Sequence, residues 1–145
     1  MTHRTDVVIV GAGPCGLFQV FELGLLGLKS TLIDTLPTPG GQCTELYPDK
    51  PIYDIPAIPM CDAQELVNRL REQIDPFGPE YLLDQQVTHV ERINELEFLV
   101  KTSAGTEIIC KAVVIAGGVG SFQPMPLRID AVEDYLDQSL YYRVK

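Results

Sequence analysis

Residues 6–34 read DVVIVGAGPCGLFQVFELGLLGLKSTLID, and this stretch decides the fold. Residues 6–10 contain a β-branched, apolar run without alternation, which is typical of a strand buried on both faces. Residues 17–26 carry apolar side chains at helical spacing, and Gly27 stands where helices commonly stop. Residues 28–33 form a second apolar run. The stretch therefore predicts a strand, a helix and another strand, in that order.

Between the first strand and the helix lies a glycine-rich turn in which Gly11, Gly13 and Gly16 have the G-x-G-x-x-G spacing. In a dinucleotide site these glycines allow a sharp turn, a close approach of the backbone to a pyrophosphate, and tight packing of the helix on the strand. The helix N-terminus would offer free N–H groups and its positive dipole end to the phosphates. Asp34 lies roughly 20 residues beyond the turn, where an acid meets ribose hydroxyls. This order of elements predicts a dinucleotide site; the alternative is a glycine-rich turn that binds no ligand.

The composition limits the class of protein. The chain has 145 residues, enough for one domain, and 46% of them are hydrophobic, enough for a buried core. Its formal net charge of −9 disfavours non-specific binding of nucleic acid, which needs a basic surface. No apolar run in the sequence is long enough to span a bilayer, and no secretory signal is visible. We therefore expect a cytoplasmic protein that binds neither nucleic acid nor membranes.

The cysteines form no C-x-x-C pair and, without a visible export signal, are expected to be reduced thiols. They are Cys15, Cys43, Cys61 and Cys110. Cys15 falls at the predicted helix N-terminus, where a thiol can become reactive. The same position also requires a small side chain for steric reasons. We favour this steric interpretation of Cys15 over that of a reactive thiol. The two histidines are far apart in sequence and no cluster has metal-ligand spacing, so the sequence predicts no metal site.

Residues 35–61 are dense in proline, which excludes a long helix or a central strand there. A structureless loop of this length is unusual in a compact domain and is often a binding loop. Its aromatic and polar side chains suit such a role: Gln42, Tyr47, Tyr53 and Asp54. The alternative is a proline-rich connector that covers the sheet edge, and composition alone does not decide between the two.

A second helix and a group of short strands come next. Asp62 is a good N-cap with Glu65 as its capping-box partner, and an apolar face follows. This helix is expected to end near Asp75, because the residue before a proline avoids the helical region. Three strand candidates follow, at residues 86–92, 97–102 and 107–110. Tight turns between them imply antiparallel pairing, so we expect a meander.

Residues 112–116 form another continuous apolar strand, followed by a second glycine-rich turn at residues 117–120. As a buried strand of the parallel sheet, it would point its carboxyl end into the same crevice as the first glycine turn, because ligands of open α/β sheets bind there. Phe122 either packs over that ligand or is an ordinary loop anchor, and its position alone slightly favours the anchor. Together these elements predict an α/β, Rossmann-like fold with a mainly parallel sheet, helices and a three-stranded antiparallel meander.

Four blocks of sequence resemble, in order, the N-terminal FAD-binding segment of the thioredoxin-reductase-like ferredoxin–NADP reductases. They are VVIVGAGPCGLF, IDTLPTPGGQCTELYPDKPIYDIP, ELVNRLREQIDPFGP and AVVIAGGVGSFQP. The second block is the most specific, since GGQ followed by LYP and YDIP separates this family from flavoproteins that share only the first block. The resemblance spans nearly all of the chain. Where family members often have Gly-Phe after the YD motif, this chain has Ala57 and Ile58.

The resemblance implies that FAD lies along the first glycine turn and reaches the later loops. Backbone groups around four residues would hold the FAD pyrophosphate: Gly11, Gly13, Cys15 and Gly16. Asp34 would bind the adenosine ribose, and Val87, in the meander, would meet the adenine. Gln42 would contact the flavin end, Tyr47 would stack on the isoalloxazine ring, and Phe122 would also touch FAD.

The same resemblance implies an oxidoreductase that moves electrons between NADPH and ferredoxin or a flavodoxin-like carrier. NADPH would deliver a hydride to the flavin, and the protein would position the cofactor without a nucleophile, general acid or general base of its own. Relatives suggest a homodimer. Residues 1–145 are expected to be an incomplete FAD-binding domain, without the family's NADPH-binding domain and returning C-terminal segment.

Other interpretations stand beside this one. The chain can be a non-catalytic FAD-binding fragment, because it has no second G-x-G-x-x-G unit for NADPH. It can also belong to another thioredoxin-reductase-like flavoprotein or be an FAD monooxygenase domain, although the GGQ and LYP block argues against the monooxygenase. A glutathione-reductase-like enzyme is excluded, because the redox partner of Cys43 would have to stand where Pro48 does.

Overall fold

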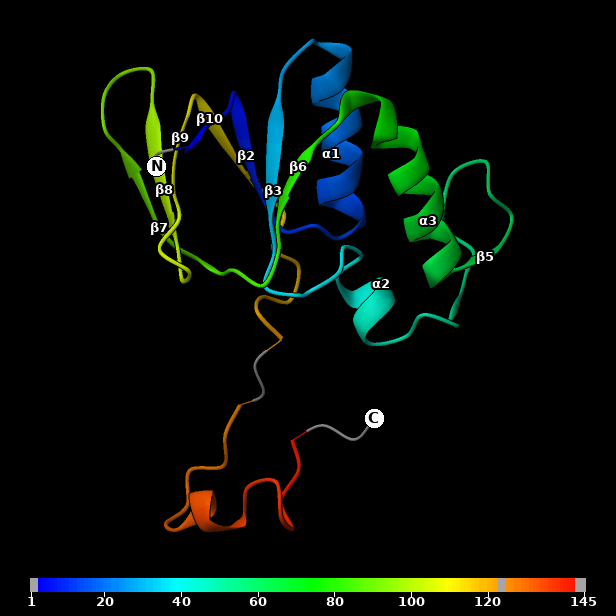
Figure 1. The fold of residues 1–145 in the computed structure, drawn as a ribbon. Coiled ribbons are helices and arrows are strands. Elements are labelled where there is room, and N and C mark those ends of the chain that lie inside the picture. Colours follow the sequence, from blue (N-terminus) through cyan, green and yellow to red (C-terminus); the bar gives the residue numbers. More distant parts are fainter. Residues whose placement is uncertain (1–2, 123–124, 143–145) are drawn as a thin grey trace.

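The computed structural model describes residues 3–122 and 125–142. The body of the molecule is an α/β fold in three layers (Figure 1). A four-stranded parallel sheet lies in the middle, in the order β10-β2-β3-β6. Helices α1 (Pro14–Leu25) and α3 (Ala63–Ile74) pack on one face of it. The sheet β1-β9-β8-β7 packs on the other face. The predicted Rossmann-like α/β class is confirmed.

The two central strands of the parallel sheet, β2 and β3, are covered on both faces, which explains why their apolar runs do not alternate with polar residues. The four strands are β2 (Val7–Val10), β3 (Ser30–Ile33), β6 (Glu80–Leu82) and β10 (Ala112–Ile115). Along β2, Val7 and Ile9 pack against the helices, whereas Val8 packs against the second sheet. Both faces of the strand are therefore covered by apolar layers, as the sequence pattern indicates.

The two edge strands of this sheet differ from the expectation. The sequence does not predict β6, because three residues are too few to carry a pattern, yet it pairs in parallel with β3. Residues 112–115 do form a strand, β10, which pairs in parallel with β2. Among the residues that the structure describes, β10 pairs with no other strand, and Ile115 is 81% exposed. The expectation that this strand is buried is therefore wrong.

The predicted antiparallel meander is confirmed. It consists of β7 (Val87–Arg92), β8 (Phe98–Thr102) and β9 (Glu107–Cys110). The pairs β7·β8 and β8·β9 are antiparallel, and Val100 and Ile108 fill the space between this sheet and the parallel one. A short strand that the sequence does not predict, β1 (His3–Arg4), adds a fourth member by pairing in parallel with β9.

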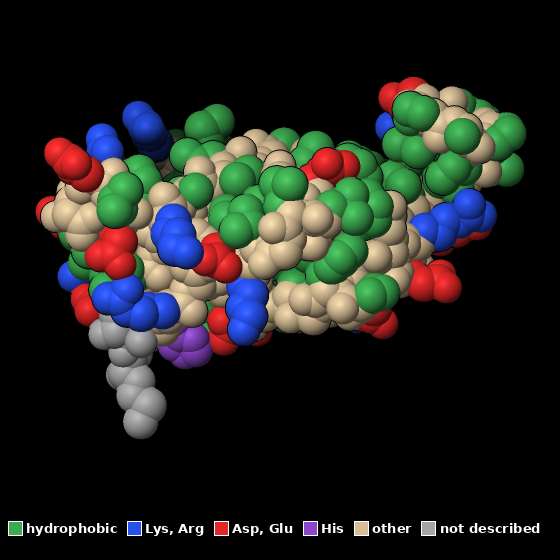
Figure 2. Space-filling model, turned by 90° about the horizontal axis from the view of Figure 1, so that it is seen from above, with side chains coloured by type: hydrophobic (Ala, Val, Ile, Leu, Met, Phe, Trp, Pro, Cys, Tyr) green, Lys and Arg blue, Asp and Glu red, His purple; other side chains and the backbone are tan. Residues whose placement is uncertain are grey.

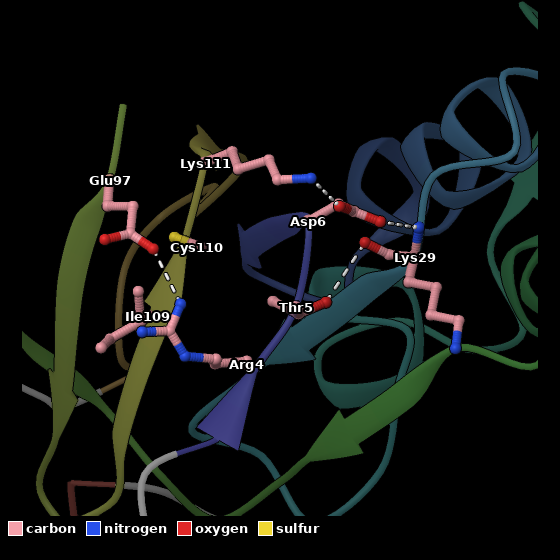
Figure 3. A pocket seen from close by; sticks show the side chains of 8 residues that line it. All are labelled: Arg4, Thr5, Asp6, Lys29, Glu97, Ile109, Cys110 and Lys111. Carbon is pink, nitrogen blue, oxygen red and sulfur yellow. Dashed lines mark hydrogen bonds and ion pairs between the residues drawn. The ribbon is translucent and has the colours of Figure 1, made fainter. Parts of the chain in front are cut away.

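Two segments cross side by side from the second sheet into the parallel one, at Asp6 and at Lys111 (Figure 3). The Asp6 carboxylate accepts hydrogen bonds from Lys111 Nζ at 2.7 Å and from the Lys29 N–H at 3.0 Å, and these bonds lower the pKa of Asp6. The hollow beside this junction, about 280 Å³, is lined by charged side chains that include the Arg4–Glu97 ion pair. The junction joins the two sheets at the amino ends of the parallel strands.

Helix α3 begins and ends where the sequence predicts. The Asp62 carboxylate accepts a hydrogen bond from the Glu65 N–H at 2.6 Å, which satisfies one of the free donors of the first turn. Three residues of the predicted apolar face are buried: Leu66, Val67 and Ile74. After Ile74 the chain continues into the 3-10 turn η1 (Asp75–Phe77), which Gly78 ends in the left-handed region. Asp75, the residue before the proline, has helical φ and ψ of −48° and −43°, so the end of α3 is where we expect it but the reason given for it is wrong.

The proline-rich segment is more ordered than a structureless loop. It contains the short helix α2 (Gln42–Glu45) and the strands β4 (Pro51–Ile52) and β5 (Cys61–Asp62), which pair antiparallel. Residues 35–61 are all described by the structure and include neither a long helix nor a central strand. The exclusion drawn from the prolines is therefore confirmed, while α2 is a feature that composition does not indicate.

Residues 125–142 leave the body of the molecule as a tail (Figure 1). The tail holds the 3-10 turn η2 (Val132–Tyr135), and the Tyr142 hydroxyl accepts a hydrogen bond from the Leu127 N–H at 2.6 Å. In neither this tail nor residues 3–122 is there a helix of the length and apolarity needed to cross a membrane.

The end of the molecule at the amino ends of the parallel strands is partly apolar. Figure 2 shows hydrophobic side chains gathered over its middle, with basic and acidic side chains interleaved at one side. Exposed apolar residues occur at the end of α1, just after it and in η1: Leu25, Leu26, Leu28 and Phe77. Within helix α1, Phe18 and Leu25 are exposed while Leu17, Val20 and Leu23 are buried, so the helix carries apolar side chains outward as well as inward.

Helix α1 approaches β2 closely because position 16 is a glycine. A Cβ atom on Gly16 would lie 1.9 Å from the carbonyl oxygen of Gly11 and 3.4 Å from Cγ2 of Ile9. The first distance is far inside van der Waals contact and involves backbone, which cannot move aside without disturbing the turn. The helix-packing role predicted for Gly16 is confirmed.

We expect Gly16→Ala to lower the free energy of unfolding by about 1–3 kcal/mol, the usual cost of an overpacked site. Urea denaturation followed by circular dichroism measures this change. Gly117→Ala is the matched control, because a Cβ there meets nothing within 4 Å, and it should shift stability by less than about 0.5 kcal/mol. A Gly16→Ala variant as stable as the wild type would contradict the packing argument.

Candidate functional site

Two adjoining hollows lie at the carboxyl ends of β2, β3 and β10, with volumes of about 230 and 150 Å³. They share four residues of the first glycine turn, the end of β3 and the second glycine turn: Gly11, Asp34, Gly117 and Gly120. The crevice that they form is where open α/β sheets bind ligands. It lies at the opposite end of the parallel strands from the charged junction of Figure 3.

Asp34 is the centre of this crevice. Its Oδ2 accepts a hydrogen bond from the Ala12 N–H at 2.6 Å, and its Oδ1 accepts one from the Leu36 N–H at 2.9 Å. Its own carbonyl oxygen accepts from the Gln85 N–H at 2.9 Å. Because an ionised carboxylate has about four lone-pair sites, acceptor capacity remains for a ligand hydroxyl. The sequence pattern predicts Asp34 as a site residue but does not indicate that Asp34 is hydrogen-bonded to three segments, at Ala12, Leu36 and Gln85.

The first glycine turn presents backbone rather than side chains to the crevice. Gly11 has a φ of +105°, and a Cβ there would lie 2.3 Å from the carbonyl oxygen of Ala116, so this glycine lets the two glycine turns touch. Gly13 is the N-cap of α1, and no side chain caps this helix. The N–H groups of Cys15 and Gly16 belong to the first turn of α1, which has no intrahelical acceptors for them. They are the donors that an anionic group could use.

The paired glycines Gly40 and Gly41 place α2 beside the first glycine turn. Gly40 donates its N–H to the carbonyl oxygen of Ala12 at 2.8 Å, and both glycines have positive φ, of +130° and +57°. Helix α2 then presents Gln42 to the larger hollow, where the Tyr47 hydroxyl donates to Gln42 Oε1 at 3.2 Å. This contact joins the two residues that the sequence assigns to one end of a ligand.

Tyr47 also has a cationic neighbour, since Lys50 Nζ lies 5.0 Å from the centroid of its ring. The phenol ring packs partly against the core that α1, α3 and the parallel sheet share, and this contact with the core fixes its position. An ammonium group at this distance interacts favourably with the face of an aromatic ring. Tyr47 is therefore held by the core, by Gln42 and by Lys50.

The smaller hollow is bounded by the segment that leads into the meander. Gln85, Gln86 and Val87 line it together with Asp34. Gln85 Oε1 accepts hydrogen bonds from the hydroxyls of Thr102 and Thr106, at 2.7 and 2.9 Å. These bonds fix the start of β7 against the rest of the meander. Gln85 is a site residue that the sequence analysis misses, because a single glutamine before a strand carries no pattern.

The second glycine turn closes the larger hollow from the β10 side. Gly118 and Gly120 have φ of +54° and +93°, and Gly120 donates its N–H to the Gly117 carbonyl oxygen at 2.8 Å. A Cβ on Gly118 would lie 3.6 Å from Nε2 of Gln42, so this turn also reaches α2. Phe122, at the end of the turn, lines the hollow with a φ of +55°.

The structure brings most of the predicted site residues together. Those that line the two hollows are Gly11, Gly13, Cys15, Asp34, Gln42, Tyr47, Val87 and Phe122. Gly16 does not line either hollow, because it is buried beneath the turn against Gly11. The contacts of all these predicted site residues with a ligand stay predictions. Tyr53, in the proline-rich segment, is 70% exposed and lines neither hollow.

Comparisons with known proteins agree with this architecture. The model of the family described as pyridine nucleotide-disulphide oxidoreductase matches residues 5–142. The chain is 58% identical over 140 residues to ferredoxin–NADP reductase 2 of Cupriavidus pinatubonensis, and 57% identical over 142 residues to the ferredoxin–NADP reductase of a Polaromonas species. These matches cover 97% and 98% of this chain but 38% and 39% of the relatives, so the chain spans about two fifths of their length.

Solved structures with the same fold include more than one kind of enzyme. Thioredoxin reductase from Lactococcus lactis superposes with a TM-score of 0.68 and 26% identity, covering 90% of this chain and 40% of that protein. A closed crystal structure of cyclohexanone monooxygenase superposes with a TM-score of 0.69 and 25% identity, covering 88% of this chain and 28% of the other.

The family match covers nearly the whole chain, and the curated relatives confirm the resemblance drawn from the four sequence blocks. The chain belongs to the pyridine nucleotide-disulphide oxidoreductase family and is related to its thioredoxin-reductase-like ferredoxin–NADP reductases.

Proposed function

We propose that this chain is the FAD-binding part of a flavoprotein that transfers electrons between NADPH and ferredoxin or a flavodoxin-like carrier. The observation that carries the proposal is the continuous crevice at the carboxyl ends of the parallel strands, which joins Asp34, both glycine turns and the Gln42–Tyr47 pair. The relatives at 57–58% identity are named ferredoxin–NADP reductases, which supports the choice of reaction.

The adenylate half of FAD is assigned to the smaller hollow and the pyrophosphate to the first glycine turn. Asp34 has lone pairs left for ribose hydroxyls, and Val87 lies across the hollow where the adenine would lie. Gly13 carries no side chain, so nothing beyond the backbone stands between the turn and a pyrophosphate. The free N–H groups and positive dipole end of the twelve-residue helix α1 favour that anion.

The flavin half is assigned to the larger hollow. Gln42 presents an amide there, Tyr47 presents a ring already fixed by its neighbours, and Phe122 also lines the hollow. The bound flavin would supply the redox chemistry, since FAD accepts a hydride and releases single electrons. The chain's own residues bind and orient the cofactor and exclude water. We assign none of them as a nucleophile or as a general acid or base.

The NADPH site and the protein partners lie beyond what these residues provide. Residues 1–145 contain a single G-x-G-x-x-G unit, so we place NADPH binding in the part of the relatives' length that this chain does not span. We accordingly assign residues 1–145 to part of an FAD-binding domain, and we assign the NADPH-binding domain and the returning C-terminal segment to the rest of the relatives' length. We also propose a homodimer, and ultracentrifugation of the chain tests this.

The alternative is a non-catalytic FAD-binding module, and one experiment separates it from the reductase. The chain is loaded with FAD and mixed anaerobically with stoichiometric NADPH, while the flavin absorbance is followed. Bleaching at an enzyme-like rate supports a reductase whose NADPH site lies within residues 1–145, and it overturns the placement of that site given above. If FAD remains bound and is not bleached, the chain by itself is a binding module, as that placement predicts, and NADPH oxidation needs the part of the relatives' length that this chain does not span.

We expect Asp34→Ala and Asp34→Asn each to weaken FAD binding by about 5- to 150-fold, from the loss of about 1–3 kcal/mol of charge-assisted hydrogen bonds. Asparagine keeps the shape, but its NH2 group would face one of the two N–H donors that the carboxylate now satisfies. Fluorescence titration with FAD measures the dissociation constant.

Asp75→Asn is the control for this experiment, because it makes the same charge change at an exposed position in η1, outside both hollows and outside the proline-rich segment. Its FAD affinity should equal that of the wild type. Circular dichroism establishes that each variant is folded before titration. A folded Asp34→Ala protein with wild-type FAD affinity would remove Asp34 from the proposed site.

A further inference from the structure

Two of the four cysteines line the larger hollow of the crevice, a third lies near one of them, and the proposed function uses none of their thiol groups. Cys15 is exposed and lines the larger hollow, Cys43 lines the same hollow with a side chain that is 8% exposed, and Cys61 is buried. Cys110 lies on the other side of the parallel sheet, in the core shared with the meander. The sequence does not indicate this grouping, because the three cysteines are far apart along the chain.

The glycines that cap α1 and α2 are in contact, and a cysteine follows each of them at the same spacing. Gly13 is the N-cap of α1 and Gly41 is the N-cap of α2, and each cysteine is the second residue of its helix. A Cβ on Gly41 would lie 3.1 Å from the Cα of Gly13, so the two caps are in contact. Cys15 is two residues after Gly13, and Cys43 is two residues after Gly41, so both cysteines come soon after the contact between the two glycines.

The surroundings of Cys43 agree with this placement. Burial raises the pKa of the Cys43 thiol, and the neighbouring thiols of Cys15 and then Cys61 raise it further. Cys43 thus stays protonated and shielded, while Cys15 is open to solvent. Within residues 3–122 and 125–142, no three His, Cys, Asp or Glu side chains gather in a way that could hold a metal ion.

We propose that Cys15 and Cys43 are a redox-active dithiol, which a peroxide closes into a disulfide across the contact between the two N-cap glycines. The peroxide oxidises the exposed Cys15 thiol to a sulfenic acid and is itself reduced to an alcohol or water. The Cys43 sulfur then attacks the Cys15 sulfur. The S–S bond forms, the S–O bond breaks, and the hydroxyl leaves as water with the proton from Cys43. A thiol reductant reverses the change.

Disulfide formation and dinucleotide binding should compete, and this consequence rests on the proposed function. The N–H of Cys15 is one of the donors assigned to the FAD pyrophosphate, and both cysteines line the hollow assigned to the flavin half. A bridge between α1 and α2 would draw the two helix starts together across that hollow. Bound FAD should in turn cover Cys15 and protect it from oxidation.

The dithiol itself is tested on the FAD-free chain, so that the result does not depend on FAD binding. The chain is treated with one equivalent of hydrogen peroxide, denatured, and titrated for free thiols. The number of free thiols should fall from four to two per chain and return to four with dithiothreitol. Non-reducing digestion with trypsin and a protease that cleaves after glutamate should give one cross-linked pair, containing Cys15 and Cys43. Cleavage at Glu45 separates Cys43 from Cys61.

Single substitutions make the assignment specific. Cys15→Ser and Cys43→Ser should each abolish the cross-link, whereas Cys61→Ser and the remote Cys110→Ser should leave it intact. A cross-link between Cys43 and Cys61, or a Cys15 that oxidises without forming any disulfide, would overturn the proposal. An intermolecular disulfide, visible as a dimer on a non-reducing gel, would overturn it as well.

The competition with FAD is measured separately. The disulfide form should bind FAD at least tenfold more weakly than the reduced form, and saturating FAD should slow cross-linking by at least the same factor. Equal FAD affinity of the two forms would refute the competition. If neither form binds FAD, the proposed function fails, while the thiol counts still decide whether the dithiol exists.

Discussion

The two backbone hydrogen bonds accepted by the Asp34 carboxylate are the interaction on which the site depends. One oxygen binds the Ala12 N–H in the first glycine turn, and the other binds the Leu36 N–H at the start of the proline-rich segment. Ala12 in turn receives the Gly40 N–H, which positions α2 with Gln42. One acid at the end of β3 therefore sets the spacing between the loops that form the crevice. Removing it would disturb the binding surface even before a ligand contact is lost.

The two ends of the parallel strands differ in structure. At the amino ends of the parallel strands, Asp6 and Lys111 join the sheets where both chain segments cross between them. At the carboxyl ends the same strands open into glycine turns that meet through Gly11 and Ala116. The same scaffold occurs in a thioredoxin reductase and in a cyclohexanone monooxygenase, so the fold alone does not select a reaction.

Local chemistry made part of this architecture predictable. Burial on both faces dictates an unbroken apolar run for β2, and Asp62 caps α3 wherever that helix packs. The strands β1 and β6, in contrast, are too short to carry a sequence pattern, and they form because they pair with strands distant in the sequence. Ile115 is exposed because β10 lies at the edge of the parallel sheet. Among the site residues, the motif indicates Asp34, but its backbone bonds and the role of Gln85 depend on three-dimensional contacts that no spacing encodes.

The central claim is that FAD is held at the carboxyl-end crevice, and an NMR titration tests it most directly. Amide resonances of the uniformly 15N-labelled chain are followed as FAD is added. The account predicts that the signals of Ala12, Cys15, Gly16, Leu36 and Gly117 shift and saturate at one equivalent, while those of Lys29 and Lys111, at the opposite end of the strands, stay in place. Absence of any shift, or shifts centred on the charged junction around Asp6, would contradict the account.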